Sequence, residues 1–551
     1  MDRRKFLRQG SLTGLGLSTV GSWSAYASLR RTQQLAVGGN TSENNSLIDQ
    51  EQNAPFLDLE EITVTDLQKK MQSGEQTSVS IIKAYLARIE KIDRSGPSLN
   101  SIIQLNPDAL KIAAVLDEER KQGKIRGLLH GIPILIKDNI NSGDQMQTTA
   151  GSLALIGNHA KEDAFVLKQL RKAGVVLLGK TNLSEWANFR SSHSCSGWSS
   201  RGGQTKCPYI LDRNPSGSSA GSGAATAASL CTVSVGTETD GSVVSPASVN
   251  GLVGIKPTVG LWSRTGIIPI SVTQDTAGPM TRTVRDAAIL LGAGIGVDEA
   301  DAVTKESLGK SLSDYTPYLI KDGLKGKRIG VEKAHFTENP DLVVLLRAAI
   351  ATMEAQGAVI IEVDVLGALK LLGHSEYQVL LYEFKDGLNK YLGSANGQVK
   401  SLKELIAFDL QNEHKLMPFF KQEILVESED KGGLDSKEYV DSLENTTGFR
   451  KTILDIMTTN NLDALSGFTN GPACCIDLAN GDYENGPSLS TPAAITGFPH
   501  ITVPMGLFHG LPIGVSFYAG PYMEPSLISM AYAFEQASLK RSKPAFLKEL
   551  L

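Results

Sequence analysis

The chain alternates between two hydrophobic periods, and glycine and proline mark the places where one period gives way to the other. From residue 62 to about residue 122, apolar side chains recur every three or four positions, which predicts helices. Short apolar runs then predict buried strands at residues 132–135, 175–178, 231–235 and 329–331. Helical patterns at residues 163–173 and 220–230 lie between the first three of these runs. The alternation predicts an α/β fold, with a large, twisted, largely parallel or mixed sheet covered by helices on both faces.

The second half of the chain divides into a charged segment and a closing apolar segment. From about residue 306 to residue 467 the sequence is more charged, with predicted helices at residues 399–410 and 442–458. This segment carries no chemical motif, and we interpret it as a variable insertion that shapes the substrate site. Residues 497–514 consist of apolar runs between glycines and prolines, which predict short buried strands joined by tight turns.

The first 27 residues have the composition of an export signal. A basic start that includes Arg3 and Arg4 precedes a weakly apolar stretch, and Ala25 and Ala27 supply the small residues of a cleavage site. The arginine pair resembles a twin-arginine signal, which directs folded proteins across the bacterial inner membrane through the Tat export machinery. We therefore predict an exported bacterial protein, periplasmic or secreted; an amphipathic N-terminal helix is the alternative. Residues 28–55 predict a flexible lead-in, followed by one domain at residues 56–551.

Composition and charge exclude several classes of protein. The 551 residues include 54 Lys and Arg against 59 Asp and Glu, so no basic excess exists to bind nucleic acid. Five cysteines are too few for a disulfide framework in a chain of this length. Outside the N-terminus no apolar run reaches the ~18 residues of a membrane span. We expect an enzyme with no nucleic-acid partner and no stable membrane association after signal removal, and nothing in the sequence requires more than a monomer.

Two short motifs match known signatures by letter but not by context. Residues 174–181 satisfy the P-loop pattern, yet the four residues that would cradle phosphate are the predicted strand 175–178. Residues 217–221 fit the nucleophile elbow, which joins a buried strand directly to a helix, whereas a polar run at residues 212–216 precedes them. We therefore predict neither a nucleotide-binding loop nor an elbow of this kind.

Two glycine- and serine-rich loops flank a predicted helix of very small residues. One loop covers residues 215–223, and the other, residues 236–242, follows the strand after that helix. Small side chains let a helix lie against neighbouring backbone, so both loops could meet at one end of the unit. Glycine-rich turns with free N–H groups, near the positive end of a helix, suit the binding of an oxyanion. Two ordinary surface turns are the alternative.

Lys137 stands at the end of the apolar strand that begins at residue 132. A lysine in a buried position is costly without partners. Burial also lowers its pKa from ~10.4 toward the range in which a neutral amine acts as a base. Considered by itself, an exposed or salt-bridged lysine is the simpler interpretation.

Together these segments resemble the amidase signature hydrolases over about residues 59–546. The resemblance is carried by residues 130–133, 137–140, 179–187, 215–223, 236–242, 254–258 and 497–514. Residues 196–205 and 236–242 are most similar to the bacterial peptide amidase branch. The resemblance implies the amidase-signature fold and the hydrolysis of carboxamide C–N bonds to a carboxylate and ammonia or an amine. It implies a small amide or peptide-amide substrate, with C-terminal peptide amides as candidates, and no cofactor.

Carried over residue by residue, the resemblance implies a catalytic triad. Ser242 would be the nucleophile that forms an acyl-enzyme, Ser218 the bridging serine in a cis peptide, and Lys137 the base. No histidine is required, and the sequence contains no metal-binding motif. The oxyanion hole would consist of the backbone N–H groups of Thr239, Asp240, Gly241 and Ser242.

Some residues near these motifs invite a plainer interpretation. Asp240 stands where the family usually has glycine, and a structural turn residue is the simpler interpretation, beside a role in tuning the oxyanion loop or contacting substrate. Cys474 and Cys475 are expected to be two buried thiols rather than a strained vicinal disulfide. Glu185 is expected to cap or brace its surroundings.

Two other functions remain open from the sequence. The catalytic A-type subunit of a tRNA-dependent glutamyl or aspartyl amidotransferase shares the signature but works in the cytoplasm within a complex. The predicted export signal and the lack of basic patches speak against it. A non-catalytic binding protein on the same fold is disfavoured because Lys137, Ser218 and Ser242 are all present.

Overall fold

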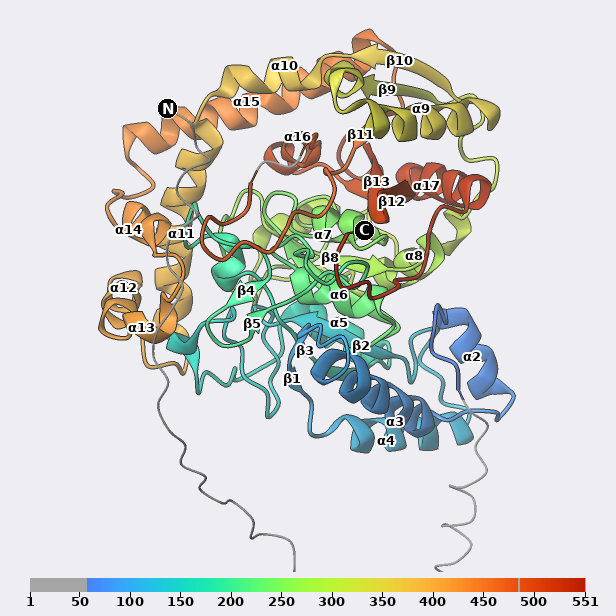
Figure 1. Cartoon of the computed structure of the whole chain (residues 1–551), viewed down its shortest axis with the longest axis vertical. Coiled ribbons are helices and arrows are strands. Elements are labelled where there is room, and N and C mark those ends of the chain that lie inside the picture. The colour runs from blue at the N-terminus through green and yellow to red at the C-terminus, as the bar shows by residue number, and fades with distance from the viewer. Residues whose placement is uncertain (1–56, 484–485, 551) are drawn as a thin grey trace, which may run out of the picture. The chain divides into compact units, whose positions relative to one another are not determined.

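A single sheet of 11 strands runs through the computed structural model, which describes residues 57–483 and 486–550 (Figure 1). The predicted export signal and lead-in lie outside the described residues. Across the sheet the strands are β1 (Ile102–Leu105), β3 (Val176–Thr181), β2 (Pro133–Lys137), β6 (Val233–Glu238), β8 (Thr276–Thr281), β7 (Val253–Lys256), β12 (His500–Phe508), β13 (Leu511–Tyr518), β11 (Ala464–Phe468), β9 (Arg328–Glu332) and β10 (Val359–Val363). A separate pair joins β4 (Trp198–Ser199) and β5 (Gly203–Gln204).

The sheet is mixed, as the alternating pattern predicts. β3, β2 and β6 run parallel, and so do β11, β9 and β10. The remaining neighbours pair antiparallel. Because β9 and β10 belong to this sheet, part of the charged segment at residues 306–467 is continuous with the main fold.

The helices surround this sheet and include every helix that the sequence predicts. They are α2 (Val64–Gln72), α3 (Ser78–Ile89), α4 (Ala109–Lys121), α5 (Phe165–Lys172), α6 (Ala220–Ala227), α7 (Val244–Val249), α8 (Val284–Ala293), α9 (Pro340–Ala355), α10 (Val365–Leu369), α11 (Ser375–Ser394), α12 (Leu402–Gln411), α13 (Glu413–Leu416), α14 (Glu423–Glu429), α15 (Lys437–Thr459), α16 (Ser490–Thr496) and α17 (Glu524–Ser538). None of the helices in the described ranges combines the length and the hydrophobicity that a bilayer crossing requires.

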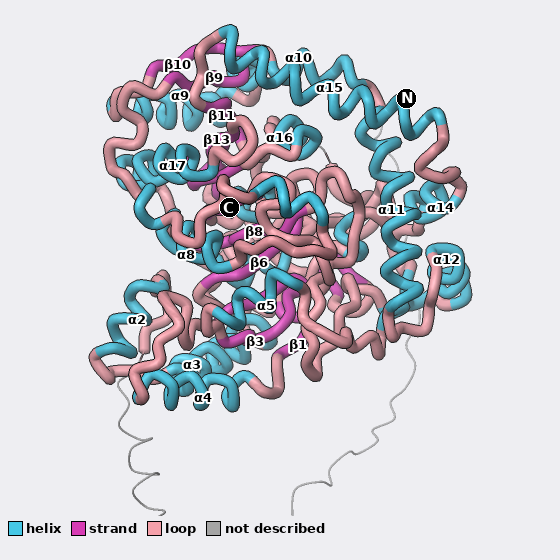
Figure 2. The backbone as a smooth tube through the Cα atoms, turned by 180° about the vertical axis from the view of Figure 1, so that it is seen from behind, coloured by secondary structure: helices cyan, strands magenta, loops and turns pink. Residues whose placement is uncertain are grey.

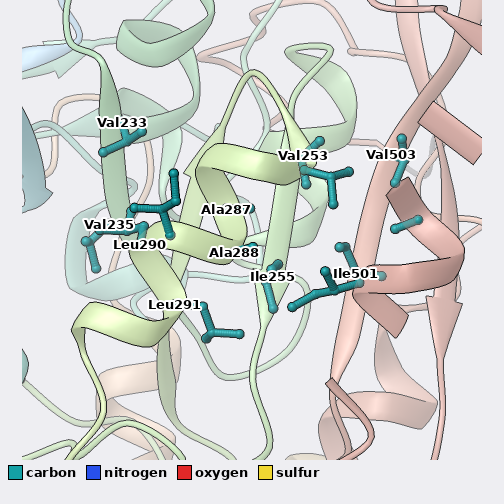
Figure 3. Packing of buried hydrophobic residues seen from close by; sticks show 14 of the residues in the cluster. Val233, Val235, Val253, Ile255, Ala287, Ala288, Leu290, Leu291, Ile501 and Val503 are labelled. Atoms are coloured by element: carbon teal, nitrogen blue, oxygen red, sulfur yellow. The ribbon is translucent and has the colours of Figure 1, made fainter. Parts of the chain in front are cut away.

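Successive side chains of β6 contact different helices. Val233 and Val235 point toward α8, together with apolar residues of β7 and β12 (Figure 3). Ser234, between them, faces α6 instead, where its hydroxyl lies 2.7 Å from that of Thr226. Because neighbouring side chains of a strand point to opposite faces, α6 and α8 cover opposite faces of the sheet. The prediction of helices on both faces is confirmed.

Two details of the sequence prediction are wrong. The helical pattern from residue 62 to residue 122 is interrupted by β1, which pairs antiparallel with β3 at the edge of the sheet. A glycine and a proline at residues 96–97 stop the preceding helix, and sheet pairing then decides the local structure. The predicted short strands after residue 497 are in fact a hairpin of nine and eight residues, β12 and β13. A register shift between Pro504 and Gly506 accommodates the proline.

Helices α11, α12 and α14 gather beside the sheet rather than on it (Figures 1 and 2). The long helix α11 contacts α12, α14 and α15, and its apolar side chains pack with residues from the first half of the chain. Leu381 and Phe384 of α11 share this cluster with Trp186 and Phe189. The charged segment therefore contributes a helical wall that adjoins the first half of the chain.

Candidate active site

Lys137 is the last residue of β2 and is fully buried. Its side-chain nitrogen lies 2.7 Å from Ser218 Oγ, 2.9 Å from Thr237 Oγ1 and 3.2 Å from the Thr237 carbonyl oxygen. All three partners are uncharged oxygen atoms. The strand therefore delivers the lysine into a polar but neutral pocket, the costly arrangement for an ammonium ion.

Burial lowers the pKa of Lys137 to about 7, against a partial opposing effect of the more distant Asp275 and Glu238 carboxylates. The pKa thus falls near neutral pH, where a large fraction of the amine is unprotonated. In that form Nζ can accept a proton from the Ser218 hydroxyl. The position at the end of a buried strand, visible in the sequence, is what removes the lysine from water.

Ser218 lies in the loop that leads into α6, directly after a cis peptide bond with Gly217. Its carbonyl oxygen accepts a hydrogen bond from Ser184 N at 3.1 Å, and Ser216 N donates to Asn214 Oδ1 at 2.9 Å. The Ser184 contact ties the loop to another segment at Ser218, and the Asn214 contact shapes the turn just before it. The cis peptide that the family resemblance implies is present.

The two serine-rich loops meet, as the small residues between them predict. Ser219 Oγ donates to the Thr237 carbonyl at 3.0 Å and accepts from Thr237 N at 3.1 Å. Ser219 N donates to the Ser242 carbonyl at 3.2 Å. A Cβ atom at Gly236 would lie 2.7 Å from Ser219 Oγ, so only glycine allows this approach. The first loop is thus held against the second, and Ser218 is brought next to the Ser242 segment.

Ser242 follows β6 in a turn that precedes α7, and it is half-buried. Gly241 adopts a φ of +75°, a left-handed conformation that glycine adopts without strain. The Glu238 carboxylate accepts hydrogen bonds from Val243 N at 2.8 Å and Val244 N at 3.0 Å, which fixes the chain on the far side of the turn. Within the described residues, the structure gives no partner to the backbone N–H groups of Asp240, Gly241 and Ser242.

Side chains from distant segments hold Thr239 and Asp240. Thr239 Oγ1 donates to Asp275 Oδ1 at 2.5 Å, and Thr491 Oγ1 donates to Asp240 Oδ2 at 2.6 Å. Burial raises the pKa of the Asp240 carboxyl, partly offset by hydrogen bonds from Ser490 and Thr491. These contacts make Asp240 part of the scaffold of the turn.

Helix α6 lies against backbone on its near side because its residues are small. A Cβ at Gly221 would lie 2.2 Å from the Ser101 carbonyl oxygen and 2.5 Å from that of Asn182. Gly221 N donates to the same Asn182 carbonyl at 3.0 Å. The close approach predicted from the sequence is present, and it seats the start of α6 beside Ser218.

The context of the two misleading motifs is as predicted. Helix α5 ends at Lys172, Gly174 has a φ of +88°, and β3 begins at Val176, so residues 175–178 do not form a phosphate-binding loop. Lys180 is buried in β3 and donates to Thr148 Oγ1 at 3.0 Å. Ser219 is preceded by a loop rather than a strand, which excludes the nucleophile elbow.

Residues outside the predicted triad follow the plainer interpretations, except that one of the two expected buried thiols is half-buried. Glu185 accepts from Ser200 N at 2.6 Å and pairs with Arg190 at 3.1 Å, so it braces two loops. Cys474 and Cys475 are free thiols, the first buried and the second half-buried. In the part of the chain that the structure describes, no group of three or more His, Cys, Asp or Glu side chains is arranged to hold a metal ion.

Sequence reasoning misses three residues that hold the site together. Thr237 lies near the end of β6, within the segment 236–242 that the sequence predicts as the second loop, and nothing in the sequence gives it a role. Its hydroxyl nevertheless contacts Lys137 and accepts from Asn139 Nδ2 at 3.0 Å. Gln274 and Asp275 are the other two. Their only signal is a polar pair directly before the glycine- and proline-containing strand β8, a strand that the hydrophobic pattern does not predict.

Comparison with known proteins adds independent information. The family model described as Amidase matches residues 80–528. A probable amidase from Arabidopsis thaliana is 40% identical over 504 residues, which cover 89% of this chain and 92% of that protein. The A-type subunit of the glutamyl-tRNA(Gln) amidotransferase from Thermoanaerobacter pseudethanolicus is 32% identical over 504 residues, covering 89% of this chain and 99% of that protein.

Among solved structures, the native peptide amidase from Stenotrophomonas maltophilia matches this fold with a TM-score of 0.85. The two chains are 46% identical, and the match covers 88% of this chain and 99% of the peptide amidase.

Proposed function

This chain belongs to the amidase signature family, and we propose that it hydrolyses carboxamides through an acyl-enzyme on Ser242. The observation that carries the proposal is the buried Lys137 amine, 2.7 Å from Ser218 Oγ with only neutral partners. A lysine in this setting is suited to be a base because its charged form is disfavoured.

In the proposed mechanism a proton passes along two serines. The neutral Lys137 amine accepts the proton of Ser218 while Ser218 accepts that of Ser242, and Ser242 Oγ attacks the amide carbon. When the tetrahedral adduct collapses, the C–N bond breaks and the relay returns the proton to the leaving nitrogen, which departs as ammonia or an amine. Water then attacks the ester by the same relay, which releases the carboxylic acid and restores Ser242.

The negative charge of the tetrahedral adduct needs donors, and the turn after β6 offers them. Support comes from the N–H groups of Asp240, Gly241 and Ser242, which have no partner within the described residues. Unpaired backbone N–H groups beside a nucleophile are typical of an oxyanion hole, with Thr239 N as a fourth candidate. Each such donor contributes about 3 kcal/mol to transition-state stabilisation.

The substrate is proposed to be the C-terminal amide of a peptide. The likeness to the peptide amidase from Stenotrophomonas maltophilia supports this class, since it extends over 88% of the chain at 46% identity. The wall formed by α11, α12 and α14 adjoins the first half of the chain and is the proposed substrate-shaping element. Through this wall the charged segment would act on specificity.

A single assay separates this proposal from the alternatives. The purified full chain, without other proteins, is incubated with a peptide amide, and ammonia and the peptide acid are measured. We expect both products in equal amounts, and no product from the Ser242→Ala variant. A component of a tRNA-dependent amidotransferase would require its complex and tRNA, and a binding protein would bind the peptide amide without releasing ammonia. Either result would contradict the proposal.

A further inference from the structure

The loop from Ser271 to Asp275 connects the turn that carries Ser242 with helix α11. On the side of the turn it makes two contacts with Thr239. Gln274 Nε2 lies 3.3 Å from the Thr239 carbonyl oxygen, and Asp275 accepts the Thr239 hydroxyl at 2.5 Å. The other Asp275 oxygen accepts from Ile270 N at 2.8 Å and Ser271 N at 2.9 Å. Both the backbone and the side chain of Thr239 are therefore fixed by one loop.

On its other side the same loop is fastened to α11 at two points. Gln274 Nε2 donates to Glu376 Oε1 at 2.9 Å. Ser271 Oγ and Thr273 N donate to Glu383 Oε2 at 2.5 and 3.1 Å. Glu376 and Glu383 are seven residues apart, so they lie on the same face of the helix. Helix α11 thus presents two carboxyl groups to the loop, and Gln274 joins that of Glu376 to Thr239.

The chemistry of these partners fixes the orientation of the Gln274 amide. The Thr239 carbonyl is an acceptor only, so the amide nitrogen faces it, and the same nitrogen donates to Glu376 Oε1. Burial and the nearby Asp240 carboxylate raise the pKa of Glu376 to about 8, so its carboxyl group is largely protonated near neutral pH. Gln274 is 1% exposed, and water does not compete for these hydrogen bonds. One side-chain NH2 group therefore donates to two acceptors, one on the turn that carries Ser242 and one on α11.

The Thr239 carbonyl and the Asp240 N–H belong to one peptide unit. A trans peptide is planar, and its C=O and N–H point in opposite directions. A hydrogen bond that holds the carbonyl toward Gln274 consequently turns the Asp240 N–H to the opposite side. The Asp240 N–H is one of the groups without a partner in the described residues. Its direction is therefore fixed by the hydrogen bond that the Thr239 carbonyl of the same peptide unit accepts.

We propose that Gln274 is a positioning residue of the oxyanion hole: it binds the Thr239 carbonyl and so directs the Asp240 N–H, while Glu376 holds Gln274 in place. This inference rests on the proposed function, because the oxyanion hole is part of that function. It also gives α11 a link to the chemical step in addition to its place in the helical wall.

The test replaces Gln274 with residues of similar size. Gln274→Met removes both N–H donors, and Gln274→Glu places an acceptor opposite the Thr239 carbonyl. Loss of a whole oxyanion-hole donor reduces kcat about 10²- to 10³-fold, so misdirection of one donor should reduce kcat by about 10- to 100-fold, more for Glu than for Met. KM should change by less than about threefold, since the interaction strengthens only in the transition state. The pH at which kcat/KM is half-maximal should stay unchanged, because Lys137 is untouched.

Gln68→Met is the matched control. Gln68 is half-buried in α2 and, like Gln274, donates from Nε2 to two acceptors, the backbone carbonyls of Leu128 and His130, at 2.6 and 3.0 Å. Both acceptors precede β2, at the end of that strand opposite Lys137. The substitution should cost a similar amount of thermal stability while kcat stays near wild type. A wild-type kcat in Gln274→Met, with a lowered Tm only, would overturn the positioning role.

Two further variants keep the outcomes distinct. If Gln274→Met does not fold, Glu376→Met decides, because it retains Gln274 but removes the acceptor that holds it; we expect a fall in kcat of several fold, and an unchanged kcat would contradict the inference. Ser242→Ala distinguishes a failure of the proposed function from a failure of the role given to Gln274. An active Ser242→Ala would overturn the proposed function, whereas an inactive Ser242→Ala beside a fully active Gln274→Met would overturn only the role of Gln274.

Discussion

Lys137 and the oxygen atoms around it explain why a lysine occupies the end of a buried strand. Its amine is fully enclosed, and burial brings its pKa to about 7. A lysine kept only for structure would gain more from a carboxylate within contact distance than from two hydroxyls and a carbonyl. This setting suits the proposed base, which is partly unprotonated near neutral pH.

The protonation of Lys137 should set the pH dependence of the reaction. The unprotonated amine is the active form, so kcat/KM should rise about tenfold per pH unit below pH 7 and level off above it. Lys137→Ala should lose activity on the order of 10³-fold or more while the protein stays folded. Initial rates between pH 5 and 9, with circular dichroism of each variant, test this.

Lys137→Arg is the informative control, since a guanidinium with a pKa above ~12 cannot act as the base. It should be as inactive as Lys137→Ala. Near-wild-type rates in Lys137→Arg would mean that residue 137 serves as a fixed positive charge and that the base lies elsewhere.

The two serines should not contribute equally. Ser242→Ala removes the nucleophile and should abolish turnover, whereas Ser218→Ala should retain a small residual rate because a water molecule can bridge to Lys137. The losses of Ser218→Ala and Lys137→Ala should not add in the double variant, because the two residues act as one relay. Single-turnover kinetics with a peptide amide measures all three. Additive losses would contradict the relay.

At the scale of elements, the site depends on how closely α6 approaches its neighbours. The helix brings Ser218 and Ser219 against the turn after β6, and Ser219 alone makes three hydrogen bonds to residues 237–242. Glycine and alanine along α6 remove the side chains that would keep it away. The sequence of very small residues is therefore a requirement of the active-site geometry.

Gly221→Ala should lower the stability of the fold considerably, although it adds only one methyl group. The added methyl group would lie 2.2 Å from a backbone oxygen of Ser101 and 2.5 Å from that of Asn182, and backbone cannot move aside as a flexible side chain can. We expect a loss of about 1–3 kcal/mol and a lower Tm, together with reduced activity.

Gly448→Ala in α15 provides the matched comparison. Its Cβ would meet nothing within 4 Å, so the same substitution in a helix interior should stabilise the protein by about 0.5–1 kcal/mol. Thermal melts of both variants test the argument. Equal effects of the two substitutions would show that the close approach of α6 to its neighbours does not decide the outcome.

At the scale of the whole molecule, the sheet brings together segments that are far apart in the chain. Lys137, the loop before α6, the turn after β6, Gln274 and Glu376 span some 240 residues of sequence, yet they form one connected set of hydrogen bonds. The expected amidase-signature fold and the likeness to peptide amidases are confirmed by the structural match. The export of the chain stays a prediction from its first 27 residues.

The export prediction can be tested directly. In a bacterial host with a Tat system, we expect the mature protein to begin at residue 28, and Arg3→Lys with Arg4→Lys to leave the precursor in the cytoplasm. Fractionation followed by N-terminal sequencing measures both. Exported protein that begins with Met1 would contradict cleavage, and a cytoplasmic wild-type chain would favour the amidotransferase alternative.

Much of the site could be predicted because it depends on local sequence. The buried end of β2, the small residues of α6 and the two serine-rich loops each leave a signal in consecutive residues, and the family resemblance assigns Lys137, Ser218 and Ser242 their roles. The hydrophobic pattern likewise places β2, β3 and β6, whose apolar runs are buried on both faces.

What the sequence could not supply depends on pairing across the chain. β1 and β8 are strands because partners in the sheet satisfy their backbone, although a helical pattern surrounds the first and a glycine and a proline lie within the second. Gln274 and Glu376 are ordinary polar residues until folding places both beside Thr239. The sequence by itself determined the α/β class and the two loop segments, because those follow from local patterns, and it carries the motifs from which the family resemblance assigns the candidate nucleophile and base. Only the tertiary structure decided which distant side chains hold the catalytic turn, because hydrogen-bond partners across the chain leave no local pattern.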